Sequence, residues 1–151
     1  MSCTAVLDAL ISIKPKHTRN ILAGVKTVEL RRRPIHLPVG ARLWIYSTLP
    51  IGRVVAAATI EDTFSDKPMA IWRRFGKASC ISHDEFQEYF HGCDTAFAVK
   101  LADVCFLDPS LTLSALKALV SRFHPPQFFM KLSRDNPLLD ILSKSLAGAS
   151  H

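Results

Sequence analysis

The chain has 151 residues, of which 48% are hydrophobic and 21% charged, and these proportions are typical of a folded globular protein. This length allows one domain with a substantial core and is short for two. The formal net charge is +6 and the pI about 9.4, which favours an anionic partner, usually nucleic acid, although solubility alone explains the excess equally well.

The position of the positive charge separates these two explanations. Residues 14–33 hold seven of the 19 lysines and arginines, and their only acid is Glu29. A surface that faces phosphates needs this kind of local concentration. The clustering therefore favours a nucleic-acid partner.

The four cysteines, Cys3, Cys80, Cys93 and Cys105, lack the spacing of a metal site. We therefore expect free thiols in a reducing compartment and no metal or other cofactor. No apolar run approaches the ~18 residues of a membrane span. The apolar N-terminus also lacks the basic region and cleavage motif of a signal peptide. We expect a cytoplasmic protein that does not cross a membrane.

The first elements are predicted from apolar runs and from the proline and glycine residues that begin or end helices. Residues 9–14 predict a short buried strand. Pro15 suits the first turn of a helix that runs through Ala23, and Gly24 suits its C-terminal stop.

Residues 27–33 predict a second strand because apolar and polar side chains alternate. Val28 and Leu30 would face the core. Glu29 and Arg31 would then share the opposite face, two positions apart on one strand.

The middle of the chain mixes strands and helices. Residues 41–62 predict two strands joined by a turn at residues 50–52, the second of them central to the sheet. Residues 66–76 predict a short helix that Gly76 ends. Residues 82–92 predict another, in which Ser82 and a glutamate three residues later form a capping box. Its aromatic residues, Phe86, Tyr89 and Phe90, would form a stripe facing the core.

The last third continues in the same way. Residues 95–108 predict one strand or two, residues 111–123 a helix, and residues 125–132 a strand. Residues 136–148 predict an amphipathic helix with Asn136 as its cap. This order favours a small α+β barrel with flanking helices over the regular alternation of a doubly wound sheet.

The segment ISIKPKHTRNILAGVKTVELRRR, residues 11–33, resembles the opening of an ASCH domain, a family of PUA-like β-barrels. The family signature GxKxxExR is met by Gly24, Lys26, Glu29 and Arg31. The similarity extends over roughly residues 10–132 and is strongest to a branch described as predicted transcriptional regulators. It implies a single domain over residues 1–151, with its core at about 10–132 and a C-terminal helix in 133–151.

The resemblance implies a basic cleft, lined by the signature, that binds RNA or a nucleotide. Lys26 would meet an anion or a carbonyl oxygen, and Glu29 would order Arg31 and accept a ligand N–H. Gly24 would shape the turn at this cleft. Other candidates can contribute charge, a hydroxyl group, an amide or a stacking ring: Arg32, Arg33, Lys14, Tyr46, Ser47 and Gln127.

Two other classes of function remain open. Some members of the family are associated with ribonuclease activity or are amidohydrolases of N4-acylcytidine nucleosides, so Lys26, Glu29 and Arg31 could be catalytic. In the amidohydrolase branch a threonine stands where this chain has Glu29, which argues against that mechanism. Alternatively the chain is an interaction module whose C-terminal helix, carrying Leu138, Leu139, Ile141 and Leu142, docks on this domain or pairs two copies as a homodimer.

Overall fold

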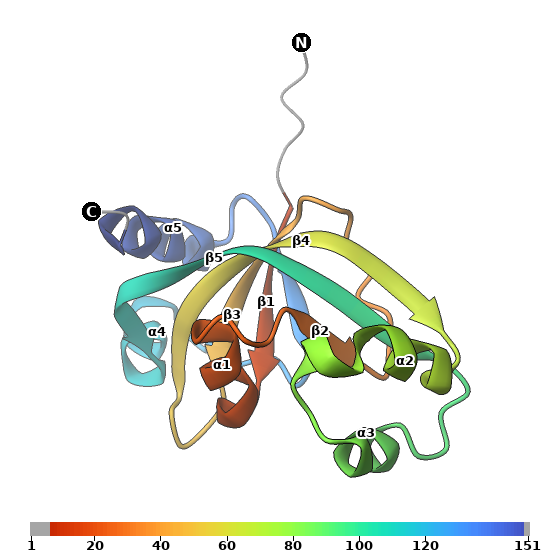
Figure 1. The fold of residues 1–151 in the computed structure, drawn as a ribbon. Helices are drawn as coiled ribbons and strands as arrows, with labels where there is room; N and C mark the ends of the chain where they lie inside the picture. Colours follow the sequence, from red (N-terminus) through yellow and green to blue (C-terminus); the bar gives the residue numbers. More distant parts are fainter. Residues whose placement is uncertain (1–6, 150–151) are drawn as a thin grey trace.

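A computed structural model describes residues 7–149 (Figure 1). Six strands and five helices lie within these residues. The strands are β1 (Asp8–Ile13), β2 (Val28–Arg31), β3 (Arg42–Ser47), β4 (Arg53–Asp66), β5 (Ala96–Thr112) and β6 (Phe129–Leu132). The helices are α1 (Pro15–Leu22), α2 (Pro68–Ser79), α3 (His83–Tyr89), α4 (Leu113–Leu119) and α5 (Pro137–Ala149). Their order along the chain is β1-α1-β2-β3-β4-α2-α3-β5-α4-β6-α5.

All six strands belong to one mixed sheet in the order β2-β5-β4-β3-β1-β6. Only β1 and β3 are parallel, and the other neighbours are antiparallel. The long strands β4 and β5 arch across the molecule in Figure 1 and give the sheet the shape of a half-barrel. The expected α+β architecture is confirmed, with β2 and β6 as the outer strands of the sheet.

The curvature of the sheet has a local cause. The pairing of β4 with β5 shifts register at three places, between Val54 and Ala56, Ala57 and Thr59, and Ile60 and Asp62. Each irregularity bends the strand and increases its twist. The single strand β5 runs through the region where one strand or two were expected.

Both faces of the sheet are covered, which is why every residue of β1 is buried. Ile11 and Ile13 pack on one face with Ile21 of α1. On the other face Leu10 packs with side chains of β3, α4 and α5, including Trp44, Tyr46, Leu116, Leu138 and Leu142. The C-terminal helix thus uses its apolar face within its own chain.

A third apolar cluster fixes the position of β2. Val28 and Leu30 pack against Phe75 of α2 and Phe86 of α3. The alternation predicted for this strand is confirmed, since Val28 and Leu30 are buried in this cluster.

Gly24 ends the first helix as expected. Its φ is +79°, a conformation that glycine adopts at little cost. The amides of Val25 and Lys26 donate to the carbonyl of Asn20, which satisfies a free helix carbonyl. A Cβ at Gly24 would meet no atom within 4 Å, so the backbone conformation alone explains this glycine.

The prediction that Gly76 ends the second helix is wrong. Helix α2 continues to Ser79, and Cys80 adopts the left-handed conformation after it. Gly76 lies inside the helix because the indole ring of Trp72 covers it: a Cβ would lie 2.7 Å from Cε3 of that ring. The glycine makes room for an aromatic ring.

In the described part of the chain, no helix is long and apolar enough to cross a membrane. Cys80, Cys93 and Cys105 are free thiols. Residues 7–149 contain no group of three or more histidine, cysteine or acidic side chains placed to hold a metal ion.

We expect Gly76→Ala to destabilise the fold by about 1–3 kcal/mol, because the overpacking against Trp72 outweighs the gain in helix propensity. Urea unfolding monitored by circular dichroism measures this change. In a Trp72→Ala background the same substitution should be neutral or stabilising. Equal effects in both backgrounds would contradict the explanation.

Candidate functional site

The polar face of β2 lines a cavity of about 1060 Å³, and we call the part where Lys26, Glu29 and Arg31 lie its closed end. The turn at Gly24 brings the chain from α1 into β2, so that α1 and β2 form two walls of the cavity. Helix α3 and the segment before β6 form the others. The lining includes an ionic group, an apolar group and a basic rim, made by Ser12, Ile13, Lys14, His17, Lys26, Glu29, Leu30, Arg31, Arg32, Arg33, Pro34, Ile35, Thr48, Ile81, Glu85, Glu88, Tyr89, Cys93, Gln127, Phe128 and Phe129.

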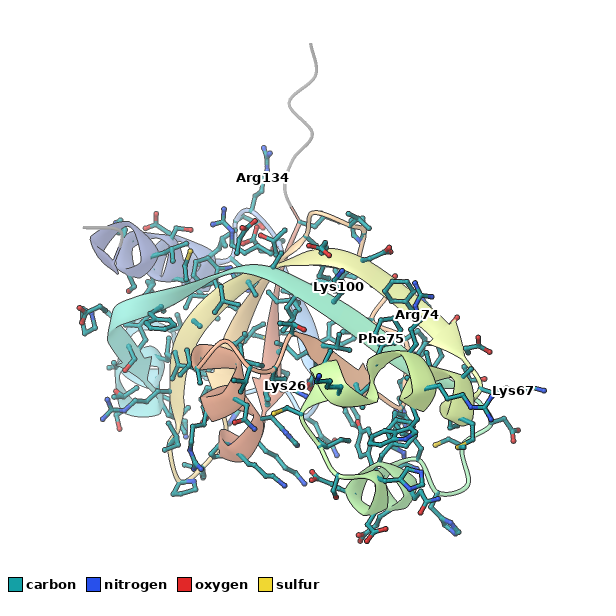
Figure 2. The ribbon with its side chains drawn as sticks, in the orientation of Figure 1. Lys26, Lys67, Arg74, Phe75, Lys100 and Arg134 are labelled. Atoms are coloured by element: carbon teal, nitrogen blue, oxygen red, sulfur yellow. The ribbon has the colours of Figure 1, made fainter. Side chains whose placement is uncertain are left out.

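Lys26 is only 3% exposed and is held by the end of α2. Its Nζ donates to the carbonyl of Ser79 at 2.6 Å. Figure 2 shows Lys26 beside that helix end. Free carbonyls at a helix C-terminus attract a cation, which explains how an ammonium group is held here. The carboxylate of Glu29 is the second partner, with Oε1 3.5 Å from Nζ.

Glu29 lies between two cations and is 7% exposed. Its Oε2 is 3.3 Å from Arg31 Nε. Arg31 also donates from Nη2 to the carbonyl of Ser12 in β1, at 3.0 Å. Its buried Nε has no hydrogen-bond partner. A buried donor in this state costs free energy until a ligand or water satisfies it.

These three side chains carry a formal charge of +1 together: two cations and one carboxylate. The cluster explains why the basic segment of residues 14–33 contains one acid, Glu29. Glu29 links Lys26 and Arg31, which would otherwise repel each other at the closed end. The same carboxylate gives the cavity an acceptor among its donors.

Lys16 and Glu85 form a second ionic group where α1 faces α3, and His17 lies beside it. Glu85 receives a hydrogen bond from Lys16 Nζ at 2.7 Å, and this bond lowers the pKa of its carboxyl. His17 Nε2 lies 3.5 Å from Glu85 Oε2, longer than a hydrogen bond. Burial, and then the ammonium of Lys26, lower the pKa of His17 below 6.5, so its ring is neutral at pH 7.

The rim is basic on one side and acidic on another. Arg32 Nε donates to Cys93 Sγ at 3.4 Å, and the Arg33 guanidinium lies over the ring of Phe128, 5.0 Å from its centroid. Glu88 of α3 lines the same cavity and has no ion-pair partner in the part of the chain that the structure describes.

Seven of the predicted site residues line this cavity: Lys14, Lys26, Glu29, Arg31, Arg32, Arg33 and Gln127. Gly24 shapes the turn and does not line it. Tyr46 is buried with Trp44 on the other face of the sheet, where burial raises the pKa of its hydroxyl. The hydroxyl of Ser47 is 2.8 Å from that of Thr18, and this buried pair ties β3 to α1.

Several lining residues were not among the predicted ones. Tyr89 was expected in the core, but its hydroxyl donates weakly to the carbonyl of Leu30 at 3.5 Å and the side chain lines the cavity. Burial raises its pKa. The Ser82 cap is confirmed, because its Oγ accepts from the Glu85 amide, but the Glu85 carboxylate turns to α1. His17 lies one helical turn from Lys14, the only sequence signal that could have found it.

The pKa of His17 predicts a pH dependence of stability. In the unfolded chain this pKa returns to about 6.5, so the unfolded state binds more protons as pH falls below that value. Stability should therefore decrease below about pH 6.5 until both states are protonated. Burial of the ring is the main cause of the lowered pKa; of the charged groups around it, Lys26 and Lys16 also lower the pKa, whereas Glu29 and Glu85 raise it. His17→Gln should lose less thermal stability between pH 7.5 and 5.5 than the parent protein does.

His124, an exposed histidine outside the cavity, provides the matched control for this experiment. His124→Gln should retain the pH dependence of the parent. Identical slopes for the parent and for His17→Gln would contradict the assignment.

Comparison with known proteins places the chain among related sequences. A family model described as "Domain of unknown function (DUF365)" matches residues 11–123. An "ASCH domain-containing ribonuclease" from Zymomonas mobilis subsp. mobilis is 36% identical over 129 residues, which cover 85% of this chain and 86% of that protein.

Solved structures agree with this match. The crystal structure of an ASCH protein from Zymomonas mobilis has a TM-score of 0.82 and 32% identity, covering 89% of this chain and 94% of the other. Human THYN1, in complex with DNA containing 5-methylcytosine, has a TM-score of 0.53 at 9% identity, covering 92% and 97%, and shows similarity of fold alone. The fold is the PUA-like α+β fold of the Zymomonas structures, and the chain belongs to the ASCH domain family.

Proposed function

We propose that this protein binds RNA in the cavity between α1, β2 and α3. The observation that carries the proposal is the buried cluster of Lys26, Glu29 and Arg31, in which Arg31 Nε lies 3.3 Å from Glu29 Oε2 but makes no hydrogen bond. The similarity to a protein named as a ribonuclease supports RNA as the partner.

The mixed charge of the cluster favours a base at the closed end. A phosphate offers only acceptors and would be repelled by the carboxylate of Glu29. A base edge presents N–H donors beside carbonyl or ring-nitrogen acceptors, so it can donate to Glu29 and accept from Lys26 and Arg31. Phosphates then lie at the rim, where Lys14 and Arg32 provide positive charge.

Cleavage of the bound RNA is a second candidate function. The printed name of the Zymomonas relative supports it. This reaction requires a different pose, with a phosphate and not a base beside the cluster: Lys26 and Arg31 can then stabilise charge developing on phosphate, and neutral His17 can accept a proton. The amidohydrolase alternative is weaker, because Glu29 stands between two cations where that branch has a threonine hydroxyl.

The biological setting is part of the same proposal. A regulatory role would act through the bound RNA, and the free thiols suit the reducing cytoplasm. A homodimer through α5 would have to use the outer side of that helix, since Leu138 and Leu142 are already buried in their own chain.

Substitutions in the buried cluster distinguish binding from catalysis. If Glu29 only orders the cations and accepts a ligand N–H, Glu29→Gln should bind RNA with a loss of about tenfold or less, because the amide keeps one acceptor. Arg31→Ala and Lys26→Ala should lose more, since each removes a charged donor. If Glu29 is instead a catalytic base, Glu29→Gln should abolish cleavage while binding persists.

Binding titrations and product analysis on the same RNA panel measure both quantities. Lys100→Ala is the control, because it removes an ion pair on β5, with Glu61, outside the cavity. Thermal melting of each variant separates a lost contact from a lost fold. Full binding and turnover in both Lys26→Ala and Glu29→Gln would reject this site.

The rim predicts a dependence on salt. Each phosphate contact with single-stranded RNA contributes about −0.7 to the slope of log affinity against log salt. Lys14→Ala and Arg32→Ala should each reduce that slope by about this amount. Arg134, at the other side of the molecule in Figure 2, is the matched exposed cation, and Arg134→Ala should leave the slope unchanged. A flat salt response in the parent would contradict phosphate contact.

A further inference from the structure

Phe128 is an exposed aromatic residue at a cavity that contains a polar cluster. Of the nine phenylalanines only Phe106 and Phe128 are exposed, and Phe128, 44% exposed, is the one that lines the cavity. Burying a phenylalanine side chain contributes roughly 1.5–3 kcal/mol of free energy. An exposed ring beside a cavity can therefore stabilise a bound ligand that covers it.

The ring already contacts a cation on one face. The guanidinium of Arg33 lies over it, 5.0 Å from the centroid, and Arg33 has no ion-pair partner within residues 7–149. A planar cation on an aromatic face presents two flat surfaces on which bases stack in single-stranded complexes, and its charge can also meet the linking phosphate.

The backbone fixes this pair relative to the closed end of the cavity. Ser12 in β1 donates its amide to the carbonyl of Phe128 at 3.1 Å, and its own carbonyl accepts from Arg31 Nη2 at 3.0 Å. Its hydroxyl donates to the carbonyl of Pro126 at 2.6 Å. One residue thus positions both the aromatic ring and the arginine of the buried cluster.

The charged side chains at the rim determine the direction in which a bound RNA strand leaves the cavity. The α3 side carries Glu88, and Glu85 there already pairs with Lys16. Glu88 therefore weakens the attraction of a phosphate on that side, whereas Arg33, which has no ion-pair partner within residues 7–149, attracts one beside Phe128. A strand with one base at the closed end therefore continues over Phe128.

We infer that the Phe128–Arg33 pair is a second nucleotide site, which stacks the base next to the one held by Lys26, Glu29 and Arg31. This inference rests on the proposed RNA-binding function and narrows it. The ligand is a single strand of at least two nucleotides, neither a free nucleoside nor a duplex, because a paired and stacked base cannot enter the closed end.

A ladder of ligand lengths tests the inference. The probes are the four ribonucleoside 5′-monophosphates, the matching homodinucleotides and the matching hexanucleotides, titrated by calorimetry into the full-length protein. Stacking of one added base is worth about 1–3 kcal/mol, so the preferred dinucleotide should bind about 5- to 150-fold more tightly than its mononucleotide.

Variants assign that gain to the ring. Phe128→Ala should bring the ratio of dinucleotide to mononucleotide affinity close to one, and Phe128→Trp should retain it. Phe106→Ala, which removes the other exposed phenylalanine, should behave as the parent does. Arg33→Lys keeps the charge but loses the planar surface, and should reduce the ratio. Arg74→Lys is its control, because Arg74 lies over Phe64 and Phe75 and does not line the cavity.

Each negative result has its own meaning. Equal affinity for mononucleotide and dinucleotide in the parent overturns the second site but leaves RNA binding in place. Equal losses for both ligands in Phe128→Ala also overturn it, because the ring would then belong to the first site. Absence of binding at every length overturns the proposed function together with the inference, and would leave Phe128 as a surface for a protein partner.

Discussion

The ion pairs of Glu29 with Lys26 and Arg31 are the constraint on which the site depends. Three charged side chains leave bulk water together, which costs free energy unless each finds partners. The partners come from separate elements: Ser79 at the end of α2 and Ser12 in β1. The cluster therefore requires α2, β1 and β2 to be placed correctly at once, and the apolar packing of β2 against α2 and α3 supplies that placement.

The arrangement leaves some hydrogen-bonding capacity unused. Arg31 Nε is buried and makes no hydrogen bond, and Glu29 meets both cations at distances longer than an ideal hydrogen bond. A core that served stability alone would satisfy these groups or replace them with apolar side chains of the same volume. Hydrogen-bonding capacity left open beside a cavity is available to a ligand or to water.

Local rules predicted much of this structure from the sequence. Alternation along residues 27–33 placed Val28 and Leu30 in the core, and Glu29 and Arg31 in the cavity. Positive φ at Gly24 and the caps at Ser82 and Asn136 also follow from local chemistry. Tyr46 was a candidate that alternation itself argues against, since it shares a face with buried Trp44.

The remainder depends on contacts between distant segments. Gly76 has the sequence signal of a helix stop, but its small size is required by the ring of Trp72, which covers it. Glu85 has the spacing of a capping box, but its carboxylate pairs with Lys16 and lies near His17, which α1 brings beside it. Tyr89 has the spacing of a core residue, yet it lines the cavity because the wall formed by α3 ends there. No local sequence pattern predicts these contacts, because most of them join residues that are far apart in the chain.

The tie between α1 and α3 has a consequence for kinetics. Lys16 and Glu85 meet in a largely exposed ion pair, which dissolved salt screens. The wall that α3 forms is seven residues long, and this pair is its side-chain link to α1. Raising ionic strength thus acts twice: it weakens the long-range attraction of a polyanion to the rim and loosens the wall past which the polyanion enters. For the RNA that we propose as ligand, salt then acts on the dissociation rate as well as on the association rate.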